Sequence, residues 1–118
     1  MDVIDLALVS MNDKWLVGGK NASLGEMIQQ LHSIPVPTGF AITTIGFSSF
    51  LTYNQLKDLI DEALRKINYT NLSSLQNTGE YIRSIIKNGK FPPTLEQKII
   101  TNYEKLGSNI SCAVRSSS

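Results

Sequence analysis

The sequence predicts an α+β fold that is rich in helices, with short strands near both ends of the chain. Apolar residues recur at helical spacing through the middle of the sequence, short β-branched apolar runs lie near the two termini, and glycine or proline separates the segments. With 118 residues, 42% of them apolar, the chain is the size of one small domain. We therefore expect one modest core and no disordered region.

The N-terminal part predicts strand, turn and helix in succession. The apolar residues of 3–9 favour a short strand, which the polar turn at 12–14 separates from a second apolar piece at 15–17. Ser23 to Glu26 then form a capping-box pattern, and apolar residues follow at positions i, i+3, i+4 and i+7. We expect a helix from there to about His32.

The stretch IPVPTGFAITT, residues 34–44, predicts extended backbone. Its two prolines stand at alternate positions and fix an extended conformation, and a short strand is expected over 40–43. Three helical segments follow, with apolar stripes over 56–67, 75–86 and 95–106. Asn88-Gly89 and Gly107 are typical helix ends, and the run ISCAVRSSS predicts a last strand over 110–114.

Composition and charge exclude several kinds of partner and site. Eleven basic residues nearly balance ten acidic ones without any run of like charge, so neither nucleic acid nor a membrane is an expected partner. One cysteine and one histidine are too few for an internal disulfide or a structural zinc site. Asp2 and Asp5 stand where a signal peptide would be positive, so we expect a cytoplasmic protein with a small-molecule ligand.

The segment VGGKNASLGEM, residues 17–27, is the candidate phosphate site. Gly18 and Gly19 lack side chains, so their amides can approach an anion closely, and the helix behind them directs its positive end toward the same place. Lys20 adds a mobile positive charge. The spacing does not match a Walker A loop, and this pattern alone favours a simple glycine turn with a solvated lysine before a capped helix.

Three motifs together point further: VGGKNASLGEM, then IPVPTGFAITT with Phe47 and Phe50 shortly after, then AVRSS at 113–117. In this combination the sequence resembles the start of the phosphoenolpyruvate synthases, within the pyruvate phosphate dikinase family. The resemblance covers the whole chain, and between about 53 and 108 it is one of pattern only. It implies that 1–118 is the N-terminal portion of an ATP-grasp-like domain that binds ATP with Mg²⁺.

The resemblance also implies roles for particular residues. The lysine of the family's GGK motif falls on Lys20 and the arginine of its AVRSS motif on Arg115, and both are expected to contact the ATP phosphates. Gly18 and Gly19 complete the cofactor-binding set. The family reaction converts ATP, pyruvate and water to AMP, phosphoenolpyruvate and phosphate through a phosphohistidine. Its histidine domain, barrel domain, metal ligands and adenine contacts are expected outside this chain. The chain would therefore hold no catalytic residue and be inactive alone. The resemblance also implies that the full-length enzyme forms a homodimer.

The remaining candidates have structural explanations. His32 lacks the family's phosphohistidine motif and is expected to be structural or solvated, Cys112 to be buried, and Thr43 and Thr44 to cap a helix. The aromatic side chains are expected in the core, and the acidic ones on a solvated helix face: Trp15, Phe40, Phe47 and Phe50; Asp58, Asp61 and Glu62. Two alternatives stay open: a related enzyme such as pyruvate phosphate dikinase or a rifampicin phosphotransferase, and a non-catalytic helical interaction module.

Overall fold

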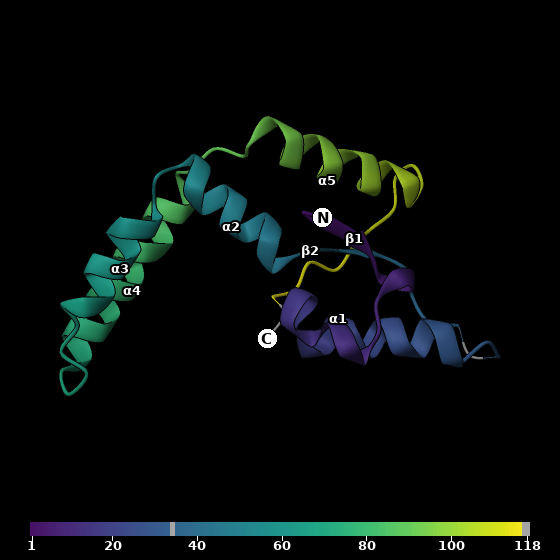
Figure 1. The fold of residues 1–118 in the computed structure, drawn as a ribbon, viewed down its shortest axis with the longest axis horizontal. Helices are drawn as coiled ribbons and strands as arrows, with labels where there is room; N and C mark the ends of the chain where they lie inside the picture. Colours follow the sequence, from purple (N-terminus) through teal and green to yellow (C-terminus); the bar gives the residue numbers. More distant parts are fainter. Residues whose placement is uncertain (34, 117–118) are drawn as a thin grey trace. The chain divides into compact units, whose positions relative to one another are not determined.

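The computed structural model describes residues 1–33 and 35–116, and Figure 1 shows the course of the chain. Ile34 of the second sequence motif, Ser117 of the third and Ser118 lie outside the described residues. In chain order the elements are β1 (Val3–Asp5), the 3-10 helices η1 (Leu6–Leu8) and η2 (Met11–Asp13), α1 (Lys14–Gln30), β2 (Phe40–Ile42), α2 (Thr44–Tyr53), α3 (Lys57–Arg65), α4 (Leu72–Lys87) and α5 (Pro93–Lys105). The helix-rich α+β class is confirmed.

The chain divides into two compact units. One is made of Met1–Phe47 with Pro93–Ser118, as far as these residues are described, and the other of Ser48–Pro92. Every motif that the sequence singles out as a candidate site belongs to the first unit.

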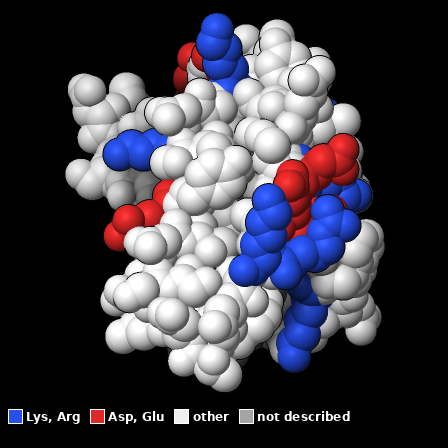
Figure 2. Space-filling model, turned by 90° about the vertical axis from the view of Figure 1, so that its left-hand side faces the viewer, with Lys and Arg blue, Asp and Glu red and all other residues white. Residues whose placement is uncertain are grey.

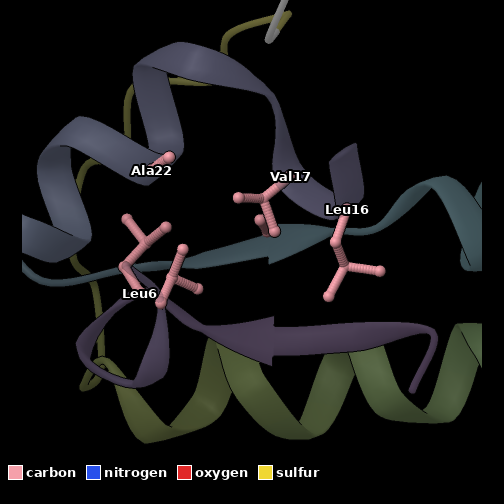
Figure 3. Packing of buried hydrophobic residues seen from close by; sticks show 6 residues of the cluster. Leu6, Leu16, Val17 and Ala22 are labelled. Carbon is pink, nitrogen blue, oxygen red and sulfur yellow. The ribbon is translucent and has the colours of Figure 1, made fainter. Parts of the chain in front are cut away.

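The first unit has its core between α1 and a small sheet. Strands β1 and β2 pair antiparallel, with Ile4 opposite Ala41 at the centre of the register. Side chains from η1 and the residue after it, from α1 and from β2 converge on one cluster, of which Figure 3 draws six residues: Leu6, Val9, Leu16, Val17, Ala22 and Ala41. Helix α5 packs on β1 and buries Leu95 almost completely.

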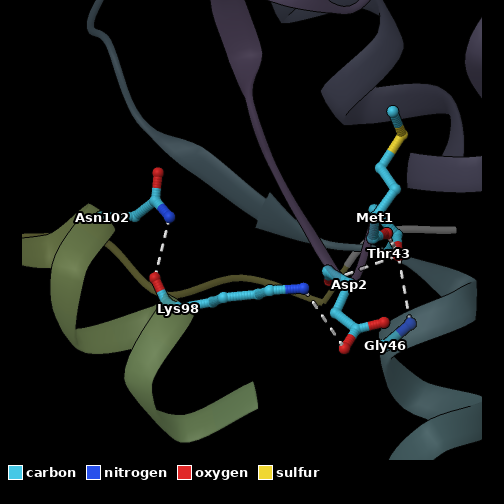
Figure 4. Close-up of polar contacts among 6 residues, drawn as sticks. All are labelled: Met1, Asp2, Thr43, Gly46, Lys98 and Asn102. Atoms are coloured by element: carbon cyan, nitrogen blue, oxygen red, sulfur yellow. Dashed lines mark hydrogen bonds and ion pairs between the residues drawn. The ribbon is translucent and has the colours of Figure 1, made fainter. Parts of the chain in front are cut away.

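Thr43 fixes the junction between β2 and α2, as Figure 4 shows. Its buried hydroxyl lies 2.7 Å from the Met1 carbonyl and 3.2 Å from the Asp2 carbonyl, to which it donates, and it accepts from the Gly46 N–H at 3.1 Å. A hydroxyl that accepts from the third residue beyond it is a helix N-cap. The structural interpretation of Thr43 is confirmed.

The second unit is built around the pair α3 and α4. Phe50 packs edge-to-face on Phe91 with ring centroids 5.6 Å apart, and the Asn54 side chain exchanges two hydrogen bonds of 2.8 Å with the backbone of Lys90. Asp58, Asp61 and Glu62 are exposed, as predicted for a solvated face. On the face that Figure 2 shows, acidic and basic side chains lie next to one another, which agrees with the balanced composition.

Several predictions about the N-terminal region are wrong. The strand expected over 3–9 ends at Asp5, and the apolar piece at 15–17 is helical, because α1 begins at Lys14 and not near Ser23. Ser23 therefore lies inside a helix. The capping box occurs instead at Ser10, whose hydroxyl and N–H bond within the turn to Asp13.

The predicted C-terminal strand is also absent. Residues 110–114 are described and have no strand partner, and both strands of the described chain lie within its first 42 residues. Without a neighbouring strand this segment remains exposed: Val114 is 96% accessible, and Cys112, expected to be buried, is exposed. Trp15 and Phe47 are exposed as well, while Phe50 is buried and Phe40 half-buried.

Among the described residues no helix combines the length and the apolar character that crossing a membrane requires.

Candidate functional site

Gly18 breaks helix α1 four residues after it begins. Its backbone angles are φ 81° and ψ 165°, which are non-helical and lie in a region that only glycine occupies without strain. The helical course resumes directly beyond it. The first amides of a helical segment have no partner four residues back, so the break presents donors and a positive dipole end beside Gly19 and Lys20.

The turn before the break is tied to the second half of α1. The Glu26 carboxylate accepts from the Met11 N–H at 3.2 Å, and the Gln29 amide donates to the carbonyls of Ala7 and Val9 at 2.9 and 2.8 Å. Gly25 permits this close approach, because a Cβ at that position would lie 2.2 Å from the Val9 carbonyl oxygen. The glycine of the SLGEM part is thus a packing residue.

An open hollow of about 510 Å³ lies at this place. It is lined by residues from η2, from both sides of the break in α1 and from the C-terminal segment: Met11, Lys14, Gly19, Lys20, Ser23, Leu24 and Arg115. Lys20 and Arg115, which are separated by 95 positions in the sequence, therefore face the same hollow.

The charge of this lining is of one sign. Lys14, Lys20 and Arg115 are the ionisable residues that line it, and no carboxylate does so among the described residues. Within the described chain none of the three has an ion-pair partner, since the ion pairs are Glu62–Lys66 and Asp2–Lys98. The nearby carboxylates of Asp13 and Glu26 accept from the Ser10 and Met11 amides. A hollow of this kind favours an anion.

The residues proposed from sequence occupy this region in different ways. Gly19, Lys20 and Arg115 line the hollow directly, and Gly18 makes the adjacent break. Ser23 and Met11 join them through a 3.7 Å contact between the hydroxyl and the thioether sulfur. His32 is exposed and does not line the hollow.

Sequence reasoning missed Lys14, which it treated as part of a polar turn. Lys14 stands at the first position of α1, and a helix start placed directly after the Ser10–Asp13 capping box would have put it in the first turn of the helix that leads into the glycine break. Thr44 was taken as a cap, but its hydroxyl donates to the Trp15 carbonyl at 3.3 Å and holds the first turn of α1.

The described residues do not form a metal-binding group. No cluster of three or more His, Cys, Asp or Glu residues occurs among them, and no carboxylate lines the hollow. Mg²⁺ prefers several oxygen ligands, carboxylates foremost. This part of the chain therefore does not fit a Mg²⁺ site of its own.

Comparisons with known proteins agree with this picture. Residues 14–118 match the family model described as pyruvate phosphate dikinase, AMP/ATP-binding domain. Phosphoenolpyruvate synthase of Aquifex aeolicus is 40% identical over 122 residues, which cover 98% of this chain and 14% of the relative. The enzymes of that name from Neisseria meningitidis and Escherichia coli are each 42% identical over 114 residues, covering 91% and 92% of the chain.

The chain spans 14% of the length of each of these three relatives. The family model begins at Lys14, the first residue of α1, and takes in the glycine break and Arg115. The family model and these relatives match nearly the whole chain. The chain therefore belongs to the family of the AMP/ATP-binding domain of pyruvate phosphate dikinase.

Proposed function

We propose that the hollow beside the Gly18 break is the polyphosphate-binding part of the ATP site of a phosphoenolpyruvate synthase. This enzyme, a pyruvate, water dikinase, converts ATP, pyruvate and water to AMP, phosphoenolpyruvate and phosphate through a phosphohistidine. Gly18 shapes the site, and Gly19, Lys20 and Arg115 contact the phosphates. The family match and the names of the relatives support this proposal.

The observation that carries the proposal is the hollow with three cations and no carboxylate. Phosphoryl transfer needs positive charge held against the oxygens of the transferred and leaving groups, and little covalent chemistry from the protein. Arg115 offers a planar fork that can hold two oxygens, and Lys20 offers a compact charge. Backbone amides after Gly18 would supply neutral donors to the same anion.

The proposal assigns the rest of the reaction to parts outside the described chain. These are the remainder of an ATP-grasp-like domain, the phosphohistidine, the pyruvate site and the Mg²⁺ ligands, for which the described residues offer no group of three or more His, Cys, Asp or Glu. The 118-residue chain by itself is then inactive. We further propose that the full-length enzyme is a cytoplasmic homodimer that acts in the pyruvate metabolism of gluconeogenesis.

Kinetics of the intact native protein test the assignment. Lys20→Ala and Arg115→Ala should each slow phosphoryl transfer from ATP to the histidine by roughly 10² to 10³-fold, the effect of losing one preorganised charge-stabilising donor. Conversion of pyruvate by protein already phosphorylated on histidine should be unchanged, because the ATP phosphates no longer take part. Rapid-quench measurement with γ- and β-labelled ATP separates the two steps.

Arg115→Lys is the matched variant. It keeps the charge but cannot bridge two oxygens, so it should recover only part of the rate. Normal histidine phosphorylation in both alanine variants would overturn the proposal.

A further inference from the structure

We infer that Lys14 is a third polyphosphate-binding cation of this hollow and that it favours ATP over AMP. The inference rests on the proposed function and deepens it. Lys14 lines the hollow together with Lys20 and Arg115, and its side chain is exposed.

The backbone around Lys14 is held on both sides, so its side chain leaves from a fixed position. The Ser10–Asp13 capping box and the bond from the Met11 N–H to Glu26 fix the turn before it. The Thr44 hydroxyl fixes the residue after it through the Trp15 carbonyl. Because the backbone is already ordered, only the lysine side chain must be ordered when a ligand binds.

Like charges around one hollow raise the free energy of the empty site. Lys14, Lys20 and Arg115 repel one another there, and within the described residues no carboxylate of the lining compensates them. Carboxylates close in sequence, at Asp13 and Glu26, already accept from backbone amides. A polyanion relieves this repulsion, and the gain increases with the charge of the anion.

The number of cations indicates the kind of ligand. ATP carries roughly four negative charges at neutral pH and AMP roughly two, since a terminal phosphate loses its second proton near pH 6. A single phosphate group can be held by Lys20 and Arg115 alone. Lys14 therefore acts on the longer phosphate chain, and its contribution disappears when ATP has become AMP.

Equilibrium binding of ATP and of AMP to the intact native protein tests this inference by calorimetry. Lys14→Gln should weaken ATP binding roughly five-fold, the upper range for one exposed charge contact, and change AMP binding less than two-fold. Lys14→Arg should retain ATP affinity within two-fold, because it keeps the charge. Lys105→Gln, at the end of α5 and away from the hollow, removes the same charge and should change neither affinity.

The outcomes separate the inference from the function on which it rests. If Lys20→Ala and Arg115→Ala weaken ATP binding while Lys14→Gln does not, the inference is wrong and the proposed function remains. Equal losses of ATP and AMP affinity in Lys14→Gln also contradict it, since they indicate a contact with the first phosphate or a change of fold. If none of the three variants weakens ATP binding, the proposed function itself fails.

Discussion

Two hollows in this molecule are lined by lysine, and they differ in whether the lining also contains a counter-ion for it. In the second unit, a hollow of about 360 Å³ along α3 and α4 is lined in part by Glu62, Lys66 and Tyr81. There Lys66 has its counter-ion in the same lining, 2.9 Å away and four residues earlier. The hollow beside Gly18 has three cations and, among its described lining residues, no counter-ion.

This difference shows how to distinguish a structural charge from one that serves a ligand. In the Glu62–Lys66 pair each charge is the counter-ion of the other, and both side chains remain more than half accessible to water. An exposed pair of this kind contributes little to stability and needs no ligand. Lys20 and Arg115 are instead brought together from distant parts of the sequence without a carboxylate between them. Such an arrangement stabilises nothing by itself and is useful when an anion binds.

The largest effect is expected when one lysine in each hollow is replaced by a residue of opposite charge. Lys20→Glu in the intact native protein should slow histidine phosphorylation by about 10³-fold or more, because a cationic donor is lost and a repelling carboxylate is added. Lys66→Glu should leave the rate within two-fold, although it makes the same chemical change. A comparable loss of rate in both variants, measured by incorporation of label from ATP, would show that the two hollows do not differ in function.

A smaller effect concerns the packing of α1 against the turn before it, in the unit that contains the first hollow. Gly25→Ala places a Cβ against the Val9 and Leu6 carbonyl oxygens, at 2.2 and 2.7 Å, so helix α1 must move away from the turn. Overpacking of this kind costs roughly 1–3 kcal/mol. Gly79→Ala in α4 meets only the flexible end of Arg83 at 3.1 Å and should stabilise its helix by up to about 1 kcal/mol, since alanine favours helix.

Hydrogen exchange of the intact protein, followed by mass spectrometry, measures both changes locally. Protection should fall across α1 in Gly25→Ala and rise slightly across α4 in Gly79→Ala. Unchanged protection of α1 in the first variant would contradict the packing role of Gly25.

The helices could be predicted where a long apolar stripe and its end signals agree. Helix α4 ends at Lys87, next to the predicted stop at Asn88, and α5 begins at Pro93 and precedes Gly107, whose φ is 122°. These signals are local, so no distant contact is needed to interpret them. The strand over 40–43 was also nearly correct, because alternate prolines before it leave few other conformations.

Predictions failed where the outcome depends on distant partners. The run at 110–114 has the composition of a strand, but within the described residues the sheet consists of β1 and β2 and this run pairs with neither. Helix α1 was placed too late because two adjacent glycines suggest a loop. In fact a single residue, Gly18, leaves the helical conformation, and the helix continues beyond it.

Only part of the candidate site could be predicted from the sequence. Lys20 and Arg115 came from motifs that resemble a family, and local pattern alone favoured a turn and a surface arginine. Lys14 belongs to neither motif, and in the structure it lines the hollow beside the turn that Met11 ties to Glu26. The local signal that could have found Lys14 is the Ser10–Asp13 capping box, which places the helix start directly before it.

The smallest expected effect concerns the pH dependence of the stability that the Glu62–Lys66 ion pair contributes. The pKa of Glu62 lies below its ordinary value of 4.5, first because of the hydrogen bond from Lys66 and second because of the positive charge of Lys66, with a smaller contribution from the charge of Arg65. A carboxyl whose pKa is lower in the folded state stabilises that state when ionised. Its contribution is therefore complete above the ordinary value and disappears as the pH falls through the lowered one.

The protection of α3 amides against hydrogen exchange should accordingly be slightly higher in the native protein than in Glu62→Gln at neutral pH. The ratio of the two should approach one in acid below the lowered pKa of Glu62. Lys66→Ala should remove the same dependence, and Glu80→Gln in α4, which lacks an ion pair among the described residues, should show none. ATP affinity should be the same in all of these variants. A change in nucleotide binding with Glu62→Gln would mean that the pair serves a ligand after all, and the distinction between the two hollows would then be lost.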